Sequence, residues 1–306
     1  MKYSNVSDYI MPLEMNGLQG RMLRLPPPAG KTREILFVYG HHSSLERWWG
    51  VVQDLNQYGG VTMPDLPGFG GMQSLYKIGE KPDVDTLADY LAAFVKLRYK
   101  RRRVTIAGLS FGFVVATRML QRYPDLVKKV DLLISVAGFA HHEEFTFSKS
   151  RLMTYRAATK FFSWRLPAVF FRNVLLHPVV LRAAYAKTRN AKEKFDTNDR
   201  QEFMRRMDFE IYLWHANDVR THMATSAEFL HLDNCQKQVA LPVHHVSVKA
   251  DRYFDNHIVE QHFRVIFSDF KAYKSRMGSH APSVIADAKE AAPLLPKGLR
   301  KLLDKA

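Results

Sequence analysis

The sequence predicts an α/β fold, a mostly parallel sheet with helices on both faces, interrupted by a helical insertion. Short apolar runs at 34–39, 61–63, 103–109 and 130–136 have the length of buried strands, and segments with helical spacing separate them. Such alternation is typical of strands that are joined by crossover helices. The alternation stops after the fourth run and resumes at 242–248, which indicates an insertion.

The insertion divides the chain. Residues 140–238 are rich in helix formers, aromatic residues and arginine, and they contain no strand-length β-branched run. We expect residues 1–139 and 239–306 to form one α/β domain around this helical segment. A chain of 306 residues suits a single α/β domain that carries an insertion.

The remaining elements follow from local signals. Residues 8–25 predict an antiparallel strand pair that turns at Asn16-Gly17, a dipeptide suited to a tight hairpin turn. Asp83 or Asp85 is expected to cap the helix that follows. Four further elements are expected, namely helices over 44–58 and 256–267, a last strand over 270–273, and a closing helical segment over 284–303 that is broken at Pro293 and Pro296.

The composition is that of a globular protein. Hydrophobic residues make up 46% and aromatic residues 12% of the chain, which a packed core needs and disordered chains lack. Residues 1–20 lack the apolar core of a signal peptide, and no apolar run approaches the roughly 18 residues of a membrane-spanning helix. Cys235 is the single cysteine, which excludes an internal disulfide and a thiolate-rich metal site. We expect a soluble, cytoplasmic protein.

Positive charge dominates the chain. Forty-five Lys and Arg residues against thirty Asp and Glu give a net charge of +15, which attracts phosphates, anionic lipid headgroups or acidic substrates. The densest basic cluster, at 96–103, lies where a helix should end and a strand begin. It is interpreted either as helix C-terminal charge with a solvated loop, or as a surface for nucleic acid or membrane. The partners expected are a small-molecule substrate and a weakly bound anionic membrane surface, with no specific nucleic acid.

A serine motif follows the third of these strands. Gly108-Leu109-Ser110-Phe111-Gly112 joins a predicted strand to a predicted helix, where a serine on a sharp turn exposes its hydroxyl and small neighbours avoid clashes. The start of the helix directs free N–H groups and a positive dipole end toward that hydroxyl. Ser110 is therefore the candidate nucleophile.

The order of elements, this turn, and the loops Tyr39-Gly40-His41-His42 and Asp65-Leu66-Pro67-Gly68-Phe69-Gly70 resemble the α/β-hydrolase superfamily. The resemblance covers about residues 30–136 and 240–285. It implies an oxyanion hole made by the backbone N–H groups of His41 and Phe111. Tyr39 stands where the family usually has His, a departure that concerns loop packing because the donor is main chain. His41 and His42 are otherwise loop histidines or metal ligands, and no metal is expected because nearby carboxylates and cysteines are lacking.

A serine nucleophile needs an imidazole to take its proton and a carboxylate to hold that imidazole. In α/β-hydrolases the order along the chain is Ser, acid, His, with the partners on loops after strands. Asp251 follows the strand at 242–248 and is the predicted acid, with Asp255 as the weaker candidate. His280 lies in a loop after the last strand and is the predicted base. Two other histidines, His257 and His262, fall inside a predicted helix.

The resemblance also implies that 140–238 is a cap, or lid, over the site. Its aromatic residues either line an acyl pocket or form the core of the cap; they are Phe161, Phe162, Trp164, Phe170, Phe171, Tyr185, Phe203, Phe209, Tyr212 and Trp214. We expect a serine hydrolase that cleaves a hydrophobic carboxylic ester through an acyl-enzyme, without a cofactor. Lactonase, aminopeptidase and C–C bond hydrolase activities remain alternatives on the same scaffold, as does a non-enzymatic protein that binds a ligand or a polyanion.

Overall fold

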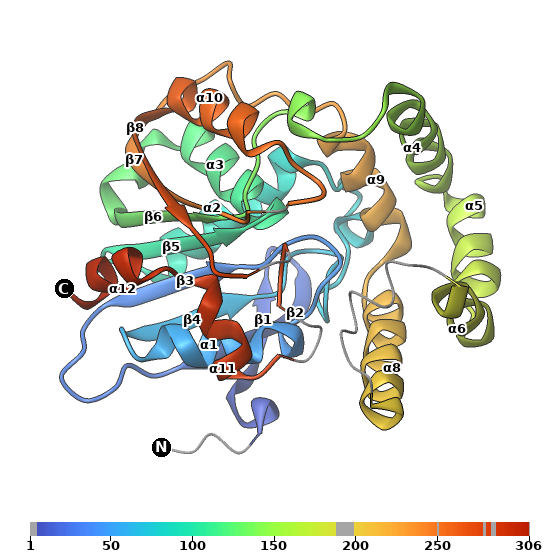
Figure 1. Ribbon diagram of the computed structural model, residues 1–306, viewed down its shortest axis with the longest axis horizontal. Helices are drawn as coiled ribbons and strands as arrows, with labels where there is room; N and C mark the ends of the chain where they lie inside the picture. The colour runs from blue at the N-terminus through green and yellow to red at the C-terminus, as the bar shows by residue number, and fades with distance from the viewer. Residues whose placement is uncertain (1–4, 188–198, 250, 278–279, 283–285, 306) are drawn as a thin grey trace.

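A computed structural model of the chain describes residues 5–187, 199–249, 251–277, 280–282 and 286–305 (Figure 1). Eight strands form one sheet in the order β1-β2-β4-β3-β5-β6-β7-β8. Strands β1 and β2 are antiparallel to their neighbours, and every pairing from β4 to β8 is parallel. The strands are β1 (Ile10–Met15), β2 (Leu18–Leu25), β3 (Glu34–Val38), β4 (Gly60–Pro64), β5 (Val104–Leu109), β6 (Val130–Val136), β7 (Val239–Ser247) and β8 (Phe267–Lys274). The predicted mostly parallel sheet is confirmed.

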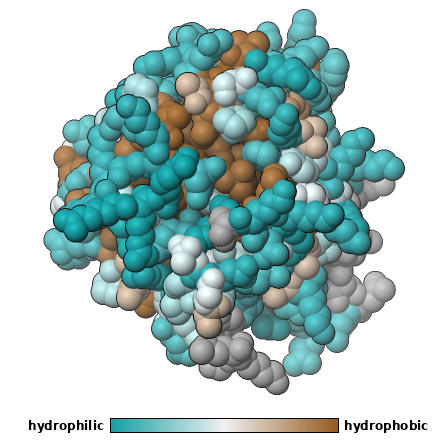
Figure 2. All heavy atoms as spheres, turned by 90° about the vertical axis from the view of Figure 1, so that its left-hand side faces the viewer, coloured by the Kyte–Doolittle hydropathy of each residue, from teal (hydrophilic) through white to brown (hydrophobic). Residues whose placement is uncertain are grey.

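Helices cover both faces of the sheet. Helices α2, α3 and α10 lie on one face, and α1 and α11 lie on the other (Figure 1). The helices that flank the sheet are α1 (Trp49–Asn56), α2 (Val84–Arg98), α3 (Phe111–Arg122), α10 (Asn256–Ile266), α11 (Ala288–Ala291) and α12 (Lys297–Asp304). On the side at the left of Figure 1, hydrophilic side chains surround a smaller apolar area (Figure 2).

Local sequence signals explain several boundaries. Asn16 and Gly17 both have positive φ, 54° and 76°, as a two-residue hairpin turn requires, and Met15 pairs with Leu18. Asp83 caps α2 by a capping box with Thr86, in which each side chain binds the backbone N–H of the other residue.

Helix α1 is shorter than the sequence predicts. It starts at Trp49, whereas helical spacing begins at Ser44. The preceding loop contains His42 at φ 53°, and the Trp48 indole N–H donates to Ser43 Oγ, so the chain makes a 3₁₀ turn before the helix begins.

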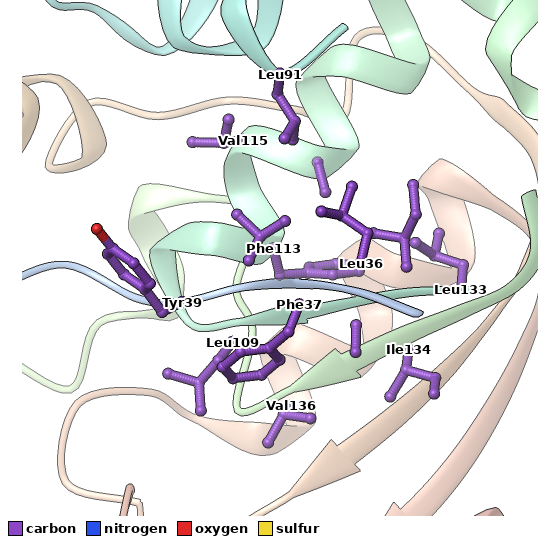
Figure 3. Close-up of a cluster of buried hydrophobic side chains, with 14 of the residues drawn as sticks. Leu36, Phe37, Tyr39, Leu91, Leu109, Phe113, Val115, Leu133, Ile134 and Val136 are labelled. Carbon is purple, nitrogen blue, oxygen red and sulfur yellow. The ribbon is translucent and has the colours of Figure 1, made fainter. Parts of the chain in front are cut away.

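The main core lies between the sheet and its helices. Every residue of β3, β4 and β5 is buried, as expected for parallel strands that are covered on both faces. Figure 3 shows Phe37, Leu109 and Val136 from three adjacent strands together on one face of the sheet and Phe113 of α3 on the other face, each at most 2% exposed.

A helical segment connects β6 to β7. Its helices are α4 (Lys149–Phe162), α5 (Arg165–Phe170), a π-helical turn (Phe171–Leu175), α6 (Pro178–Lys187), α8 (Arg200–Ala216) and α9 (Val219–Phe229). They lie beside the sheet, at the right of Figure 1, and have a small apolar cluster of their own that includes Leu176, Met207 and Ile211. No single helix in the described part of the chain is long and apolar enough to cross a membrane.

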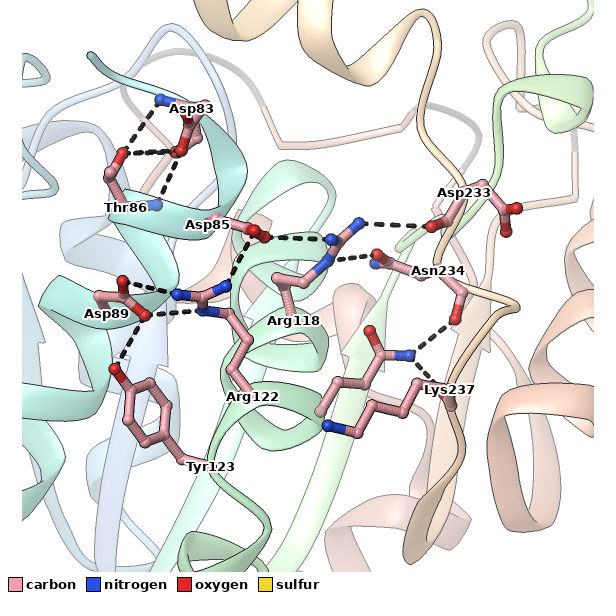
Figure 4. Close-up of polar contacts among 11 residues, drawn as sticks. Asp83, Asp85, Thr86, Asp89, Arg118, Arg122, Tyr123, Asp233, Asn234 and Lys237 are labelled. Carbon is pink, nitrogen blue, oxygen red and sulfur yellow. Dashed lines mark hydrogen bonds and ion pairs between the residues drawn. The ribbon is translucent and has the colours of Figure 1, made fainter.

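A polar network fastens the end of this segment to the sheet domain (Figure 4). Arg118 of α3 donates to Asp85 of α2 at 3.0 Å and to Asn234 at 2.8 Å, where the chain returns from α9 to β7. Arg122 extends the network to Asp89 of α2. The segment between β6 and β7 is therefore tied to two helices of the sheet domain.

Candidate active site

Ser110 lies on the turn between β5 and α3. Its backbone has φ 50° and ψ −121°, a strained conformation for a residue with a side chain. Its N–H donates to Val136 O at 2.9 Å, and its carbonyl accepts from Phe113 N at 3.0 Å, so bonds on both sides hold the turn. This geometry is that of the nucleophile turn which the motif predicts.

The two glycines of the motif lie where no side chain would fit. A Cβ at Gly112 would overlap the carbonyl oxygens of Val38 and Tyr39, because α3 begins directly against the end of β3. A Cβ at Gly108 would lie 2.6 Å from Phe113 Cα. The spacing of the motif therefore allows α3 to pack against the strands, which fixes the position of Ser110.

The loop after β3 lies against Ser110. A Cβ on Gly40 would lie 3.2 Å from Ser110 Cβ, which places the backbone of the predicted donor His41 beside the serine. The imidazole of His41 bonds Thr225 Oγ1 through Nε2 at 2.8 Å and packs on Phe111 with ring centroids 5.3 Å apart. Burial, and then the neighbouring His42, lower the pKa of His41 to about 3, so this ring is neutral at physiological pH.

Asp251 and His280 form a close pair. His280 Nδ1 lies 2.7 Å from Asp251 Oδ2, and their side chains are 17% and 2% exposed. Asp251 Oδ1 accepts from the backbone N–H groups of Tyr253 and Phe254 at 2.9 and 3.3 Å. Burial raises the pKa of Asp251, but the hydrogen bond and charge of His280 and the two N–H donors outweigh it, so the pKa lies below its usual value. An ionised Asp251 keeps the proton of His280 on Nδ1 and leaves Nε2 able to accept one.

The other sequence candidates face elsewhere. Asp255 caps α10, where its Oδ1 accepts from His257 N at 2.9 Å and Ile258 N at 3.4 Å. His257 is exposed on α10, and His262 bonds Glu144 at 2.8 Å. Of the three histidines that follow Asp251 in the sequence, only His280 lines the same cavity as Ser110.

This cavity has a volume of about 370 Å³ and contains Ser110, His280, His41 and Phe111 in its wall. Half of the remaining wall residues are aromatic and come from both the sheet domain and the helical segment, namely Trp48, Phe139, Phe145, Phe147, Tyr155, Phe229, Tyr253 and Phe254. A concave, mainly apolar pocket with a few polar groups is typical of a site for a small molecule.

A family model described as "alpha/beta hydrolase fold" matches residues 35–222, more than half of the chain. The chain belongs to the α/β-hydrolase family. A comparison with curated proteins by sequence finds no match.

Solved structures of other α/β-hydrolases share the fold. An enol-lactonase from Burkholderia xenovorans has a TM-score of 0.65 at 13% identity, over 96% of this chain and 98% of the lactonase. An esterase from Exiguobacterium antarcticum has a TM-score of 0.66 at 13% identity, over 94% of this chain and 97% of the esterase. An esterase from Thermogutta terrifontis has a TM-score of 0.61 at 16% identity, over 97% of each chain. At these identities the likeness concerns the fold alone.

Sequence reasoning on this hydrolase missed a polar cluster between the sheet domain and the helical segment. Glu210 of α8 is fully buried and contacts His42 Nε2 at 3.2 Å and the Tyr185 hydroxyl at 2.8 Å. The His222 ring lies 4.2 Å from that of His41, and burial, followed by the charges of His41 and His42, holds the pKa of His222 well below its usual value. No local pattern relates Glu210 to His42, 168 residues away.

Proposed function

We propose that this protein is a serine hydrolase that cleaves a carboxylic ester of a hydrophobic small molecule. The observation that carries the proposal is that Ser110, on its strained turn, shares one cavity with a mainly apolar wall with His280, and that His280 is hydrogen-bonded to Asp251. Neutral ester substrates suit such a wall, and the serine, imidazole and carboxylate supply the groups that acyl transfer needs.

In the proposed reaction, Ser110 Oγ attacks the ester carbonyl while His280 Nε2 takes the hydroxyl proton. The backbone N–H groups of His41 and Phe111 stabilise the oxyanion. The tetrahedral intermediate collapses, the C–O bond to the alcohol breaks, and His280 gives its proton to the leaving oxygen. Water then attacks the acyl-enzyme with His280 again as base, which releases the acid and restores Ser110.

We propose that residues 140–238 act as the cap of the site. Support comes from α4 and α9, since Tyr155, Thr159, Ser226 and Phe229 form part of the cavity wall. The aromatic residues of the segment divide between this wall and the segment's own packing, where Phe162, Phe171 and Trp214 contact its apolar cluster.

An aminopeptidase needs acidic residues to hold the amine of its substrate, and the nearest candidates in the helical segment are Glu143 and Glu144. Glu143 and Glu144 follow β6, and neither belongs to the cavity wall among the described residues. Glu144 is buried and accepts from Ala140 N at 2.8 Å and His262 Nδ1 at 2.8 Å, which commits it to holding the loop.

A fluorophosphonate probe and a series of p-nitrophenyl esters of graded chain length test the proposal. The wild-type protein should be labelled and should hydrolyse the esters, whereas Ser110→Ala should lose both properties. An unlabelled wild-type protein with no esterase activity would refute a serine hydrolase. A wild-type protein that is labelled but does not hydrolyse the esters, and that opens lactones or cleaves C–C substrates, would still have Ser110 as its nucleophile. Its substrate class would then differ from the one proposed.

A further inference from the structure

The outer surface of α5, the π-helical turn and α6 exposes an unusual amount of apolar area. Nine of the seventeen large apolar side chains that are exposed among the described residues lie within 161–180. Leu166 is 80%, Val179 66%, Trp164 62% and Phe170 54% exposed. Isolated exposed apolar residues need no explanation, but a continuous group marks an interaction surface. We name this surface, defined by Phe161, Trp164, Leu166, Val169, Phe170 and Val179, the apolar face.

Positive charge surrounds the apolar face. Between Phe145 and Lys187 the chain contains eight Lys and Arg residues and no Asp or Glu. Among them, Lys160, Arg165 and Arg172 are exposed in or next to the same helices. Among the ion pairs of the described residues, the only anion paired with these helices is Asp208 of α8, which contacts Arg182 at 2.8 Å. Apolar helices whose own charged residues are all basic have the composition of helices that bind at an anionic lipid interface.

The shape of the segment also suits an interface. The helical stretches Arg165–Leu175 and Pro178–Tyr185 together have the length and hydropathy of a membrane span, but they bend by 72° at the break between them. In Figure 1, α5 and α6 form the side of the molecule farthest from β8, so the sheet does not cover them. A bent, apolar pair at the edge of a molecule can lie in the headgroup region without crossing the bilayer.

We propose that the apolar face docks on the surface of an anionic lipid bilayer. Tyr155 and Thr159 of α4 line the cavity, and Phe161 in the next turn of the same helix belongs to the apolar face. Docking would therefore bring the cap side of the cavity close to lipid-borne esters. This deepens the proposed function and rests on it only for the arrival of substrate, since lipid binding itself involves no reaction.

Charge favours lipid over a second copy of the chain as the occupant. A symmetric dimer through the apolar face would bring together two copies of helices whose own charged residues are all basic, and like charges across an interface are unfavourable. An anionic membrane surface instead attracts each Lys or Arg that comes near it.

Vesicle co-flotation of the full chain with Ser110→Ala, which prevents turnover, tests the docking. The protein should float with vesicles of 70% phosphatidylcholine and 30% phosphatidylglycerol, bind at least tenfold more weakly to pure phosphatidylcholine, and dissociate in 0.5 M NaCl. Trp164→Gln with Leu166→Gln should reduce binding at least tenfold. The matched control, Leu97→Gln with Val265→Gln, changes side chains that are 57% and 49% exposed elsewhere and should bind like the parent.

Equal binding of both double variants to anionic vesicles would overturn the proposal, and so would a protein that does not bind. A dimer that the Trp164 and Leu166 variant abolishes, in the absence of lipid binding, would assign the face to a second copy and also overturn it. The proposed function is tested separately, with the wild type and with both double variants made in a chain that keeps Ser110. The measurement is hydrolysis of soluble p-nitrophenyl butyrate. A wild-type protein that binds vesicles but does not hydrolyse the ester would overturn the proposed function and leave the lipid docking in place.

A different cluster carries a second, independent inference. His141 and Glu143 follow β6, and His262 lies on α10, and one ligand atom from each of these residues lies within 4.8 Å of the others. Glu143 Oε2 is 3.7 Å from His141 Nδ1 and 4.0 Å from His262 Nε2. The carboxylate therefore lies between the inner nitrogens of the two rings.

The outer nitrogens of both rings face carboxylates. His262 Nδ1 donates to the buried Glu144 at 2.8 Å, and His141 Nε2 lies 3.8 Å from Asp233 Oδ1. His262 Nε2 is the unprotonated nitrogen of its ring because Nδ1 donates to Glu144, and His141 Nδ1 is unprotonated because it accepts from Glu143 N at 3.2 Å, a bond that an ion would displace. Metal-binding histidines typically have their far N–H held by a carboxylate, as His262 does, and Asp233 lies near the far nitrogen of His141.

The structure assigns this cluster as a zinc-class cation site in which His141 Nδ1, Glu143 and His262 Nε2 bind the ion. Two imidazoles and a carboxylate are a set that Zn²⁺ accepts, with water in the fourth position. Glu143 is exposed and its side chain is free to move toward the two rings. Small rotations of the His141 and His262 rings would then bring the three ligand atoms within bonding distance of the ion. Because His141 pairs with Asp233 at the return of the helical segment, the ion would tie both ends of that segment to α10.

Isothermal titration of the chelator-treated full chain with Zn²⁺, and with Co²⁺ as a spectroscopic probe, tests the site. One ion should bind in the micromolar range or tighter and should raise the melting temperature. His141→Ala and Glu143→Gln should each weaken binding at least tenfold, whereas His257→Ala, an exposed histidine of α10, should not. Millimolar affinity in the wild type, or equal affinity in all variants, would overturn the assignment.

Discussion

The sheet domain and the helical segment between β6 and β7 are built on different principles. Every residue of β5 is buried, whereas none of the fourteen residues of α4 is. The side chains of strands that are covered on both faces have little freedom to move. Helices that pack in a single layer leave one face exposed to solvent. The proposed reacting groups therefore belong to the rigid part, and the surfaces available to partners belong to the segment.

The largest loss of activity should come from Ser110→Ala. We expect kcat/KM for p-nitrophenyl butyrate to fall by about 10⁵-fold or more, the loss typical of a serine hydrolase whose nucleophile is removed. The unfolding free energy should stay within about 0.5 kcal/mol of wild type, because the backbone conformation is unchanged. Residual activity above about 1% of wild type would place the nucleophile elsewhere.

Asp251→Asn should lower kcat by about 10⁴-fold, because the amide cannot hold the His280 tautomer in the same way. Asp255→Asn is the matched control. Asp255 caps α10, and Asn is an equally good cap, so this variant should stay within about threefold of wild type. The reverse result would reassign the acid to Asp255. Steady-state kinetics of the two variants decides.

Truncation of a large apolar residue should affect the two regions unequally. Phe113 of α3 is completely buried in the main core, and Phe113→Ala should cost about 3–5 kcal/mol of unfolding free energy. Leu166 is 80% exposed, and Leu166→Ala should change the unfolding free energy by less than about 0.5 kcal/mol. Urea denaturation measures both. A large loss for Leu166→Ala would mean that the apolar face packs against the protein.

Two largely buried histidines of the sheet domain should make the protein less stable in acid. Burial lowers the pKa of His245, on β7, to about 4, and that of His41 to about 3, with the charge of His42 as a second cause. The unfolded chain binds protons at these residues below about pH 6.5, whereas the folded protein does not, so stability present above that pH is lost as pH falls.

Each of these histidines should contribute about 1.4 kcal/mol per pH unit between about pH 6 and 4.5. Urea unfolding at pH 7.5, 6.0 and 5.0 measures the decline. His245→Gln should make it shallower by about one proton, and His257→Gln, on the surface of α10, should leave it unchanged. Identical slopes for all three proteins would mean that His245 is protonated in the folded state.

Much of the sheet domain could be predicted because its signals are local. The apolar runs, the Asn16-Gly17 turn and the Gly108-Ser110-Gly112 spacing each reflect a requirement of the backbone within a few residues. The helical segment gave weaker information, since aromatic residues at helical spacing do not distinguish between a core, a cavity wall and an exposed face.

The sequence alone determined the fold class, the succession of strands and helices along the chain, and the position of Ser110 at a strand-to-helix turn. Only the tertiary structure decided that Asp251 contacts His280 while Asp255 caps a helix, that Glu210 meets His42, and that Trp164 and Leu166 face outward. The physical reason is distance along the chain. Steric and hydrogen-bonding demands between near neighbours are written into residue type and spacing, whereas contacts between remote residues exist only after the whole chain has packed.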